Sequence, residues 1–353
     1  MPEIDFLNQP RFRSQDGQAV NSARELPRHP GRIRPHMKLT RKSSLWIACI
    51  VAVWLAVCAI AGSVSAEWAL HPMRSTLTQD DEEQAAAVAE SHGAILQQVE
   101  ITASDGAVLR AWAIRPTAGN GDAVILLHGM ANNRAGMLGP ADMLLRQGYS
   151  VLLPDARAQG MSGGDLATYG YLEAGDLQRW FDRLVEKQAP RCIDAIGESM
   201  GAAQLLNSLR TVRGFCAVAA ESPFASFREV SYVRIGEWFS TGPWLGRTLL
   251  RPVVEFGIIY ARWKYGVDLA QDNPAQAVAA SRVPVLLIHG LIDNNIPPYN
   301  SEMILAASEG RNRDVSLWEP PDAGHCGAMG AEPDEFERRV VGWFQSHQAS
   351  AMR

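Results

Sequence analysis

The longest apolar stretch of the chain lies near its start. No charged residue occurs from Ser43 to Ala66. As a helix, the 22 residues from Leu45 to Ala66 would extend about 33 Å, enough to cross the hydrocarbon core of a bilayer. A buried core helix is the alternative, but a run of this length between charged flanks is typical of a membrane span. The pattern therefore predicts a transmembrane helix, or the apolar region of a signal peptide, over residues 45–66.

Polar residues dominate the next stretch, residues 67–96, which we interpret as a connector with one helix. Thr78 is a candidate N-cap because Asp81 follows it by three residues, as in a capping box, and Gly93 can end the helix. From residue 97 to about residue 350 the pattern changes to short apolar runs that alternate with helical segments. This change of pattern marks the beginning of the main domain.

Eight short runs in the main domain read as strands. They are Val99–Thr102, Val108–Ile114, Asp122–Leu127, Tyr149–Leu153, Cys192–Ile196, Ala217–Ala220, Val285–Ile288 and Val315–Trp318. Helical patterns separate most of them, and such alternation is typical of a mainly parallel sheet with helices on both faces. A turn at Ser104–Gly106 joins the first two runs, so an antiparallel hairpin should form one edge. The sequence predicts an α/β fold.

One stretch interrupts this alternation. Residues 224–281 contain ten aromatic side chains, roughly 17% against 8% for the whole chain, and show helical patches without a clear strand. We interpret the stretch as an inserted helical cap. Its aromatic side chains should pack against the main domain, and some of them can also line an apolar substrate pocket.

Charge divides the 353 residues unevenly. The whole chain has a net charge of -5, but residues 1–44 carry nine Lys and Arg against four Asp and Glu. This basic head should be disordered and cytoplasmic, because basic residues flank the cytoplasmic end of a span. The acidic body that follows would then lie on the extracytoplasmic, periplasmic side. Its negative charge argues against a nucleic-acid partner.

A signal peptide is the alternative to a membrane anchor. Val64-Ser65-Ala66 suits signal peptidase, and a translation start at Met37 would leave an n-region of ordinary length. The mature protein would then begin at Glu67 and be soluble. We favour the uncleaved anchor because the numbered head is long for a signal peptide. Both interpretations place the body outside the cytoplasm.

A candidate nucleophile lies between a predicted strand and a predicted helix. Gly197-Glu-Ser-Met-Gly201 has the pattern G-x-S-x-G. In a strand–turn–helix context this pattern forms a tight elbow that presents the serine hydroxyl, here of Ser199, and requires small flanking residues. A serine hydroxyl needs a base to take its proton and a carboxylate to orient that base.

The loops after later strands supply candidates for both roles. His325 follows the last strand, whereas His128 and His289 directly follow apolar strands and precede glycine. We therefore expect His325 to be the base. Asp293 follows the strand Val285–Ile288 and is the expected acid. Asp322 is its competitor, although its short distance to His325 in sequence is no advantage, because triads assemble across the ends of separate strands.

The oxyanion of a tetrahedral intermediate needs backbone N–H donors. We expect one from Met200, directly after the nucleophile. The second should come from Met130, in the loop that follows the strand Asp122–Leu127. Gly129 would allow the chain to turn closely there.

These residues together resemble the α/β-hydrolase fold family. The resemblance covers residues 96 to 347 and rests on the order Ser199, Asp293, His325, with the segments His128-Gly129, Asp155–Gly163, His289–Asp293 and Gly324-His325. Asp155–Gly163 is similar to the family's D-x-R-G-x-G-x-S loop, with Ala158 where glycine is usual. The resemblance implies an eight-stranded sheet, a cap inserted after Ala217–Ala220, and a serine hydrolase without a cofactor or metal. Ser199 excludes the dehalogenases of this fold, which use aspartate there.

Five cysteines complete the candidate chemistry. Cys49 and Cys58 lie in the apolar run, and no cysteine shows metal-ligand spacing. Cys192 and Cys216 each open a predicted strand, and these strands would be neighbours in the family's fold. They could form a disulfide in an oxidising compartment, or remain two buried thiols.

The sequence thus favours a serine esterase acting on a small-molecule ester or acyl substrate, with the membrane as a further partner. A serine peptidase of the same fold is one alternative, and a non-catalytic binding protein that keeps the fold is another. The acidic body and the aromatic cap favour a neutral or apolar acyl group. Fold resemblance does not name the substrate.

Overall fold

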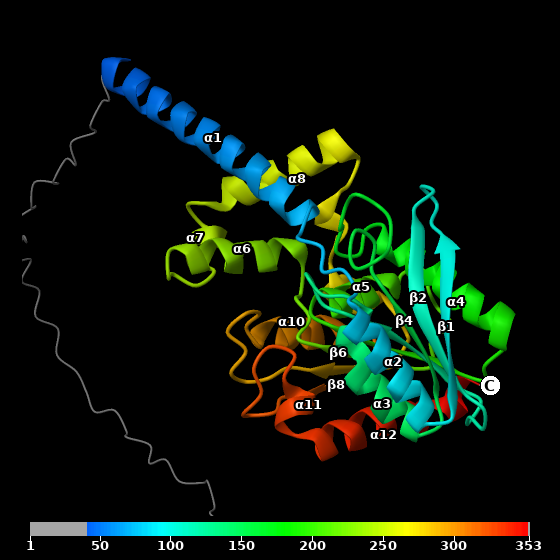
Figure 1. Ribbon diagram of the computed structural model, residues 1–353. Coiled ribbons are helices and arrows are strands. Elements are labelled where there is room, and N and C mark those ends of the chain that lie inside the picture. Colours follow the sequence, from blue (N-terminus) through cyan, green and yellow to red (C-terminus); the bar gives the residue numbers. More distant parts are fainter. Residues whose placement is uncertain (1–40, 352–353) are drawn as a thin grey trace, which may run out of the picture. The chain divides into compact units, whose positions relative to one another are not determined.

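A single eight-stranded sheet organises the computed structural model, which describes residues 41–351 (Figure 1). Its strands are β1 (Ala94–Thr102), β2 (Val108–Pro116), β3 (Ala123–Leu127), β4 (Ser150–Pro154), β5 (Ile193–Glu198), β6 (Val218–Glu221), β7 (Val285–Ile288) and β8 (Val315–Trp318). Their order is β1-β2-β4-β3-β5-β6-β7-β8. β1 and β2 are antiparallel, β2 is antiparallel to β4, and every other pair is parallel. The predicted eight-stranded, mostly parallel sheet is confirmed.

Helices and short 3-10 turns connect the strands. They are α1 (Arg41–Leu70), α2 (Gln79–Ser91), η1 (Arg134–Met137), α3 (Leu138–Arg146), α4 (Glu173–Gln188), α5 (Met200–Ser208), α6 (Phe227–Trp238), α7 (Trp244–Arg247), α8 (Arg251–Tyr265), η2 (Leu269–Gln271), α9 (Pro274–Ala280), α10 (Tyr299–Ser308), α11 (Ala328–Ala331) and α12 (Pro333–Ala351). Thr78 caps α2 in a capping box with Asp81, as its spacing predicted.

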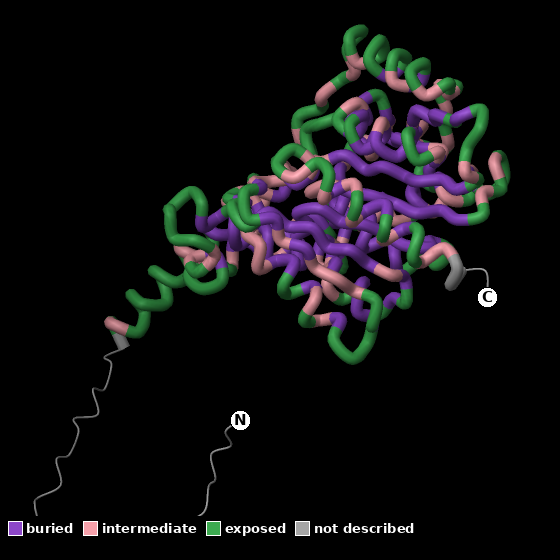
Figure 2. Tube along the Cα trace, turned by 90° about the horizontal axis from the view of Figure 1, so that it is seen from below, coloured by how far each residue is buried: buried purple, intermediate pink, exposed green. Residues whose placement is uncertain are grey.

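Both faces of the sheet are covered, which explains the unbroken apolar runs (Figure 2). In β3 every residue is buried. Val124 and Leu126 pack with α2, α3 and α12 on one face. Ile125 and Leu127 pack with α4, α5, α9 and α10 on the other face. Successive side chains of a strand point to opposite faces, so a strand buried on both faces needs no polar alternation.

Between β6 and β7 the chain leaves the sheet and forms the helices α6 to α9. A third apolar cluster joins α6 and α8 to the end of α1 and includes Cys58, Leu70, Phe224, Val254 and Ile258. We call α6, α7 and α8 the cap. Its aromatic side chains do not all face inward, since Trp238, Trp244 and Trp263 are exposed.

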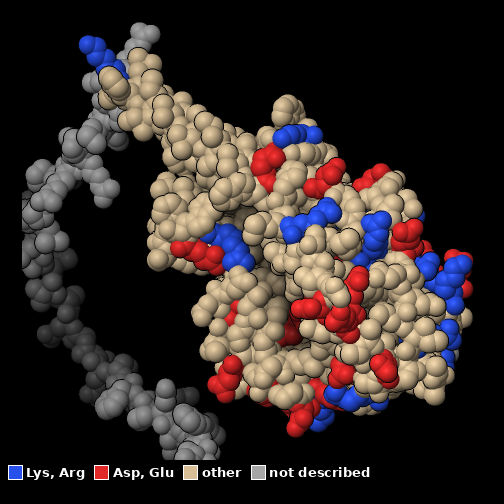
Figure 3. Space-filling view, viewed as in Figure 1, with Lys and Arg blue, Asp and Glu red and all other residues tan. Residues whose placement is uncertain are grey.

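α1 is long and apolar enough to cross a membrane, by length and composition. Among the described residues, 50–351 form one compact unit, while residues 41–49, the beginning of α1, belong to a separate one. The helix continues past Ala66 to Leu70, although Glu67 was expected to begin the connector. Figure 3 shows the uncharged surface along α1. The disordered head was predicted for residues 1–44, but its last four residues, from Arg41 to Ser44, are helical and begin α1. The rest of the head, with the start at Met37, lies outside the described part of the chain.

Glu67 remains helical because its charge is neutralised and hydrogen-bonded by α8. Its carboxylate accepts hydrogen bonds from the hydroxyls of Tyr260, at 2.5 Å, and Tyr265, at 2.8 Å. The Nζ of Lys264 lies 2.7 Å from the same carboxylate. A carboxylate with three such donors can lie at a helix–helix contact at little cost.

Cys192 and Cys216 form a disulfide, with Cα atoms 5.8 Å apart. Each precedes one of two neighbouring parallel strands, β5 and β6, so the two side chains meet at the same end of the sheet. The alternative of two free thiols at these positions does not hold in the structure. Such a bond is typical of proteins in oxidising compartments.

Candidate active site

Three loops at one edge of the sheet bring together residues that are far apart in sequence. Ser199 follows β5, Asp293 follows β7 and His325 follows β8. These strands are parallel, so their carboxyl ends lie at the same edge, where α/β proteins place their ligand sites.

Ser199 occupies a sharp turn between β5 and α5. Its φ of 52° and ψ of -115° are unusual for a residue with a side chain. The glycines on either side are required sterically. A Cβ on Gly197 would lie 2.5 Å from the carbonyl oxygen of Gly201, and a Cβ on Gly201 would lie 2.4 Å from that of Leu127. The turn therefore holds the serine hydroxyl at the end of the strand.

A continuous hydrogen-bond chain joins the three predicted residues. The Oγ of Ser199 lies 2.9 Å from Nε2 of His325. The Nδ1 of His325 lies 2.8 Å from Oδ2 of Asp293. Because an ionised carboxylate only accepts, Nδ1 carries the hydrogen and Nε2 presents its lone pair to the serine hydroxyl. The competing Asp322 is exposed to solvent, and Asp293 occupies the place beside His325.

Asp293 is buried, and its surroundings favour the ionised form. Burial opposes ionisation, but hydrogen bonds from His289, His325 and the backbone N–H of Ile296 outweigh it and hold the pKa of Asp293 well below its usual range. The N–H groups of Asn295 and Ile296 both donate to Oδ1 at 2.9 Å. Asp293 can therefore orient His325 as a charged group across the neutral pH range.

His289 is a polar neighbour of Asp293 that the sequence prediction set aside. Its Nε2 lies 2.7 Å from the carbonyl oxygen of Ile296 and 3.3 Å from Oδ2 of Asp293. Its Nδ1 lies 2.7 Å from the hydroxyl of Ser301. Nε2–H must be the donor, since the carbonyl only accepts. Its position four residues before Asp293, in the same loop, was the signal that could have identified it.

The loop after β3 carries Met130, one of the two expected oxyanion donors. His128 anchors this loop, because its Nε2 accepts from the N–H of Ala156 at 3.1 Å and its Nδ1 donates to the carbonyl of Gly129 at 2.8 Å. A Cβ on Gly129 would lie 3.4 Å from the Cβ of Ser199. Met130 lines the same pocket as Ser199, and so does Met200, the other expected donor.

The Asp155–Gly163 loop is tied to the rest of the domain by a buried ion pair. The Nη2 atom of Arg134 lies 2.9 Å from Oδ2 of Asp155. Gly160 passes so close that a Cβ there would be 2.2 Å from the Asp155 carboxyl carbon. Ala158 has a φ of 57°, the region that favours glycine, which is the residue usual in the family at this position.

Two glutamates that the sequence prediction did not single out lie side by side next to Ser199. Glu198 and Glu221 are register partners on β5 and β6. Burial, together with their mutual repulsion, raises the pKa of Glu198 to about 8. Burial also raises the pKa of Glu221 to about 7, against a hydrogen bond from the N–H of Ala328. Glu221 supports the elbow, because its backbone carbonyl accepts from the N–H of Ser199 at 2.9 Å.

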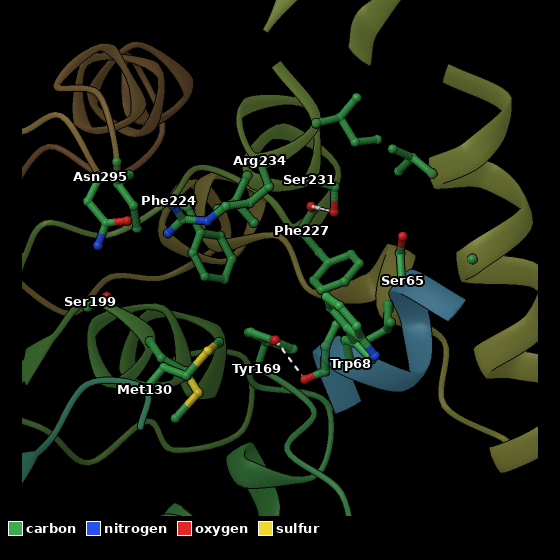
Figure 4. A pocket seen from close by; sticks show the side chains of 18 of the residues that line it. Ser65, Trp68, Met130, Tyr169, Ser199, Phe224, Phe227, Ser231, Arg234 and Asn295 are labelled. Atoms are coloured by element: carbon green, nitrogen blue, oxygen red, sulfur yellow. Dashed lines mark hydrogen bonds between the residues drawn. The ribbon is translucent and has the colours of Figure 1, made fainter. Parts of the chain in front are cut away.

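A cavity of about 620 Å³ opens beside the hydroxyl of Ser199 (Figure 4). Its size lies within the range of small-molecule sites, about 300–1,000 Å³. Most lining side chains are apolar, and those from the segment between β6 and β7 include Phe224, Phe227, Val230, Ile235, Trp238, Val253, Val254 and Ile258. The site can therefore hold an apolar group next to an activated hydroxyl.

Known proteins resemble this chain in both sequence and structure. The uncharacterized protein YqkD of Bacillus subtilis is 30% identical over 190 residues, 53% of this chain and 60% of that protein. The uncharacterized protein YfhR of Escherichia coli K12 is 27% identical over 259 residues, 71% of this chain and 81% of that protein. The chain thus spans less than two thirds of YqkD.

Among solved structures, the esterase Pf2001 of Pyrococcus furiosus has a TM-score of 0.62 and 26% identity, over 79% of this chain and 100% of that one. The acylaminoacyl peptidase of Pyrococcus horikoshii has a TM-score of 0.56 and 16% identity, over 74% of this chain and 44% of that one, a likeness in fold alone. The model of the alpha/beta hydrolase family matches residues 124–339. The chain belongs to the alpha/beta hydrolase family.

Proposed function

We propose that the protein is a membrane-anchored serine hydrolase that cleaves a carboxylic ester. The observation that carries the proposal is the hydrogen-bond chain from Ser199 through His325 to the buried Asp293. The positions and tautomers of these groups are those that nucleophilic catalysis by serine requires.

The reaction runs through an acyl-enzyme. The Oγ of Ser199 attacks the ester carbonyl while Nε2 of His325 takes its proton, and Asp293 stabilises the imidazolium. The N–H groups of Met130 and Met200 bind the oxyanion of the tetrahedral intermediate. His325 then gives the proton to the leaving alcohol. Water, activated by the same histidine, releases the acid and restores Ser199.

Two observations favour an ester over a peptide. The pocket beside Ser199 is lined mainly by apolar side chains, several of them from the cap, and these suit an acyl group. The solved esterase Pf2001 is 26% identical, whereas the peptidase neighbour is related by fold alone. A serine peptidase remains the second candidate, and a non-catalytic binding protein the third.

The anchor is part of the same proposal. α1 would cross the membrane, with the basic residues before it in the cytoplasm and the hydrolase domain on the extracytoplasmic side. The disulfide between Cys192 and Cys216 supports an oxidising compartment. A soluble exported form cleaved after Ala66 is the alternative.

The decisive variant is Ser199→Ala. We expect it to lower kcat for p-nitrophenyl esters by about 10⁶-fold and to abolish labelling by a fluorophosphonate probe. Ser346→Ala, on the exposed face of α12, is the control and should retain both. Unchanged hydrolysis and labelling in Ser199→Ala would refute the proposal.

A substrate panel then separates the candidates. p-Nitrophenyl esters of rising chain length are compared with aminopeptidase substrates on the same preparation. Faster turnover of the peptide substrates would favour the peptidase. Absence of probe labelling in the wild-type protein would favour the binding protein.

A further inference from the structure

One wall of the pocket beside Ser199 is built by the membrane-anchor helix. Gly62, Ser65, Ala66, Trp68 and Ala69 of α1 all line this cavity. Figure 4 shows Ser199 and Met130 on one side and Ser65 and Trp68 on the other. The pocket therefore extends from the reactive hydroxyl to the helix that carries the apolar run.

Close packing fixes this wall in place. A Cβ on Gly62 would lie 2.3 Å from the carbonyl oxygen of Val253, and one on Gly257 would lie 2.9 Å from that of Gly62. The hydroxyl of Tyr169 donates to the carbonyl of Ala69 at 2.8 Å. Together with the three donors to Glu67, these contacts make the end of α1 an integral part of the folded domain.

The contacts also set the direction of the cap relative to the apolar run. Gly62 meets Val253 and Gly257, while Glu67, one turn later, meets Tyr260 and Lys264. α1 and α8 therefore run in the same direction. The beginning of α8 and the preceding α7 lie toward the earlier turns of α1, those that the proposed anchor places in the membrane.

The cap surface on that side exposes large apolar side chains next to the charged Arg247 and Arg251. It carries Trp238, Phe239, Trp244 and Leu249, each more than half exposed. Aromatic residues of this kind are enriched at membrane–water interfaces. Trp68 and Trp238 also line the pocket although they are 74% and 65% exposed, so they flank its opening.

We propose that this pocket is a binding site for a long acyl chain, and that the enzyme takes long-chain acyl esters directly from the bilayer. The inference rests on the proposed esterase activity and adds the substrate class to it. The ester C–O bond breaks, the hydroxyl of water joins the acyl carbon, and the alcohol leaves with the remaining proton. The chain lies between the cap and the α1 wall, and it enters past Trp68 and Trp238.

Two substitutions at neighbouring positions of α1 test whether this helix forms one wall of the acyl-chain site. Ser65→Trp places a bulky side chain in the pocket, whereas Val64→Trp places the same side chain at an exposed position that does not line it. The full-length protein is reconstituted in phosphatidylcholine vesicles, and kcat/KM is measured for p-nitrophenyl palmitate and butyrate. We expect the palmitate-to-butyrate ratio to fall by about tenfold or more in Ser65→Trp and to stay at the wild-type value in Val64→Trp.

A second experiment tests whether the substrate enters from the bilayer. p-Nitrophenyl palmitate is supplied either in the vesicles that hold the enzyme or in separate vesicles, and we expect faster hydrolysis in the first case. Equal rates would show entry from solution and overturn the route.

An unchanged ratio in Ser65→Trp, or a wild-type preference for butyrate, would overturn the acyl-chain site. These results differ from failure of the esterase itself, which Ser199→Ala reports. Fluorophosphonate labelling of each variant verifies folding, and Ser65→Leu, a smaller change with the same expected direction, replaces Ser65→Trp if labelling is lost.

Discussion

The paired glutamates beside Ser199 make stability depend on pH. The carboxyl of Glu221 is buried, and its pKa is raised to about 7, against about 4.3 in an unfolded chain. Between these values the unfolded state loses a proton that the folded state keeps. Stability should therefore fall as the pH rises from about 4.3 to about 7.

Replacing Glu221 by glutamine removes the part of this dependence that Glu221 contributes. Glu221→Gln keeps an oxygen that can accept from the N–H of Ala328 but cannot ionise. We expect its free energy of unfolding to exceed that of the wild type by about 4 kcal/mol at pH 8 and to match it at pH 4. Urea unfolding at the two pH values measures the difference. The exposed Glu90→Gln on α2 is the control, and a gain of the same size at both pH values would contradict the assignment.

The residues of the site differ in how readily the sequence predicts them. Ser199 and the glycines beside it belong to one local motif, so the strand–turn–helix pattern was enough to find the candidate. Asp293 and His325 follow strands in the expected order. His289 gave a weaker signal, its place in the loop of Asp293. Glu221 gave none, because only the sheet brings its backbone carbonyl close to Ser199.

At the scale of elements, strands buried on both faces were the easiest to predict. The run Asp122–Leu127 became β3 with a change of one residue at its start. α10 (Tyr299–Ser308) was not predicted, since its apolar residues form no clear stripe. The end of α1 differed for another reason, because Glu67 remains in the helix through donors from α8, which lie more than 190 residues away in sequence.

The crossing of α1 and α8 gives a test in which local and tertiary effects have opposite signs. Alanine favours a helix over glycine by about 1 kcal/mol, yet a Cβ on Gly62 would collide with the backbone of Val253. We therefore expect Gly62→Ala to lower the free energy of unfolding by about 1–3 kcal/mol. This loss should appear as a lower melting temperature of the detergent-solubilised protein.

The matched control is Gly342→Ala on α12, where a new Cβ meets no atom within 4 Å. This variant should be stabilised by about 0.5–1 kcal/mol. If both variants were stabilised alike, the close crossing of the two helices would be wrong.

For the molecule as a whole, the central question is whether α1 is retained. Cleavage after Ala66 would remove Gly62, Ser65 and Ala66 from the pocket wall and would leave Glu67 as a chain end. The packing therefore favours the uncleaved anchor among the two alternatives left open by the sequence.

We expect the protein isolated from membranes to retain residues before Glu67. N-terminal sequencing and the intact mass of the active, probe-labelled protein measure this directly. Extraction should require detergent, whereas high salt should leave the protein in the membrane. An active protein that begins at Glu67 and is released without detergent would contradict the anchor.

The sequence by itself determined the α/β fold, the eight strands, the apolar helix and the candidate trio, because each depends on periodicity or on a motif within a few residues. Only the tertiary structure decided that α1 continues to Leu70, that its last turns line the pocket, and that Cys192 is bonded to Cys216. It also decided which polar groups support Asp293 and Ser199. These features depend on contacts between distant segments, whose energies come from packing and hydrogen bonds that no local pattern records.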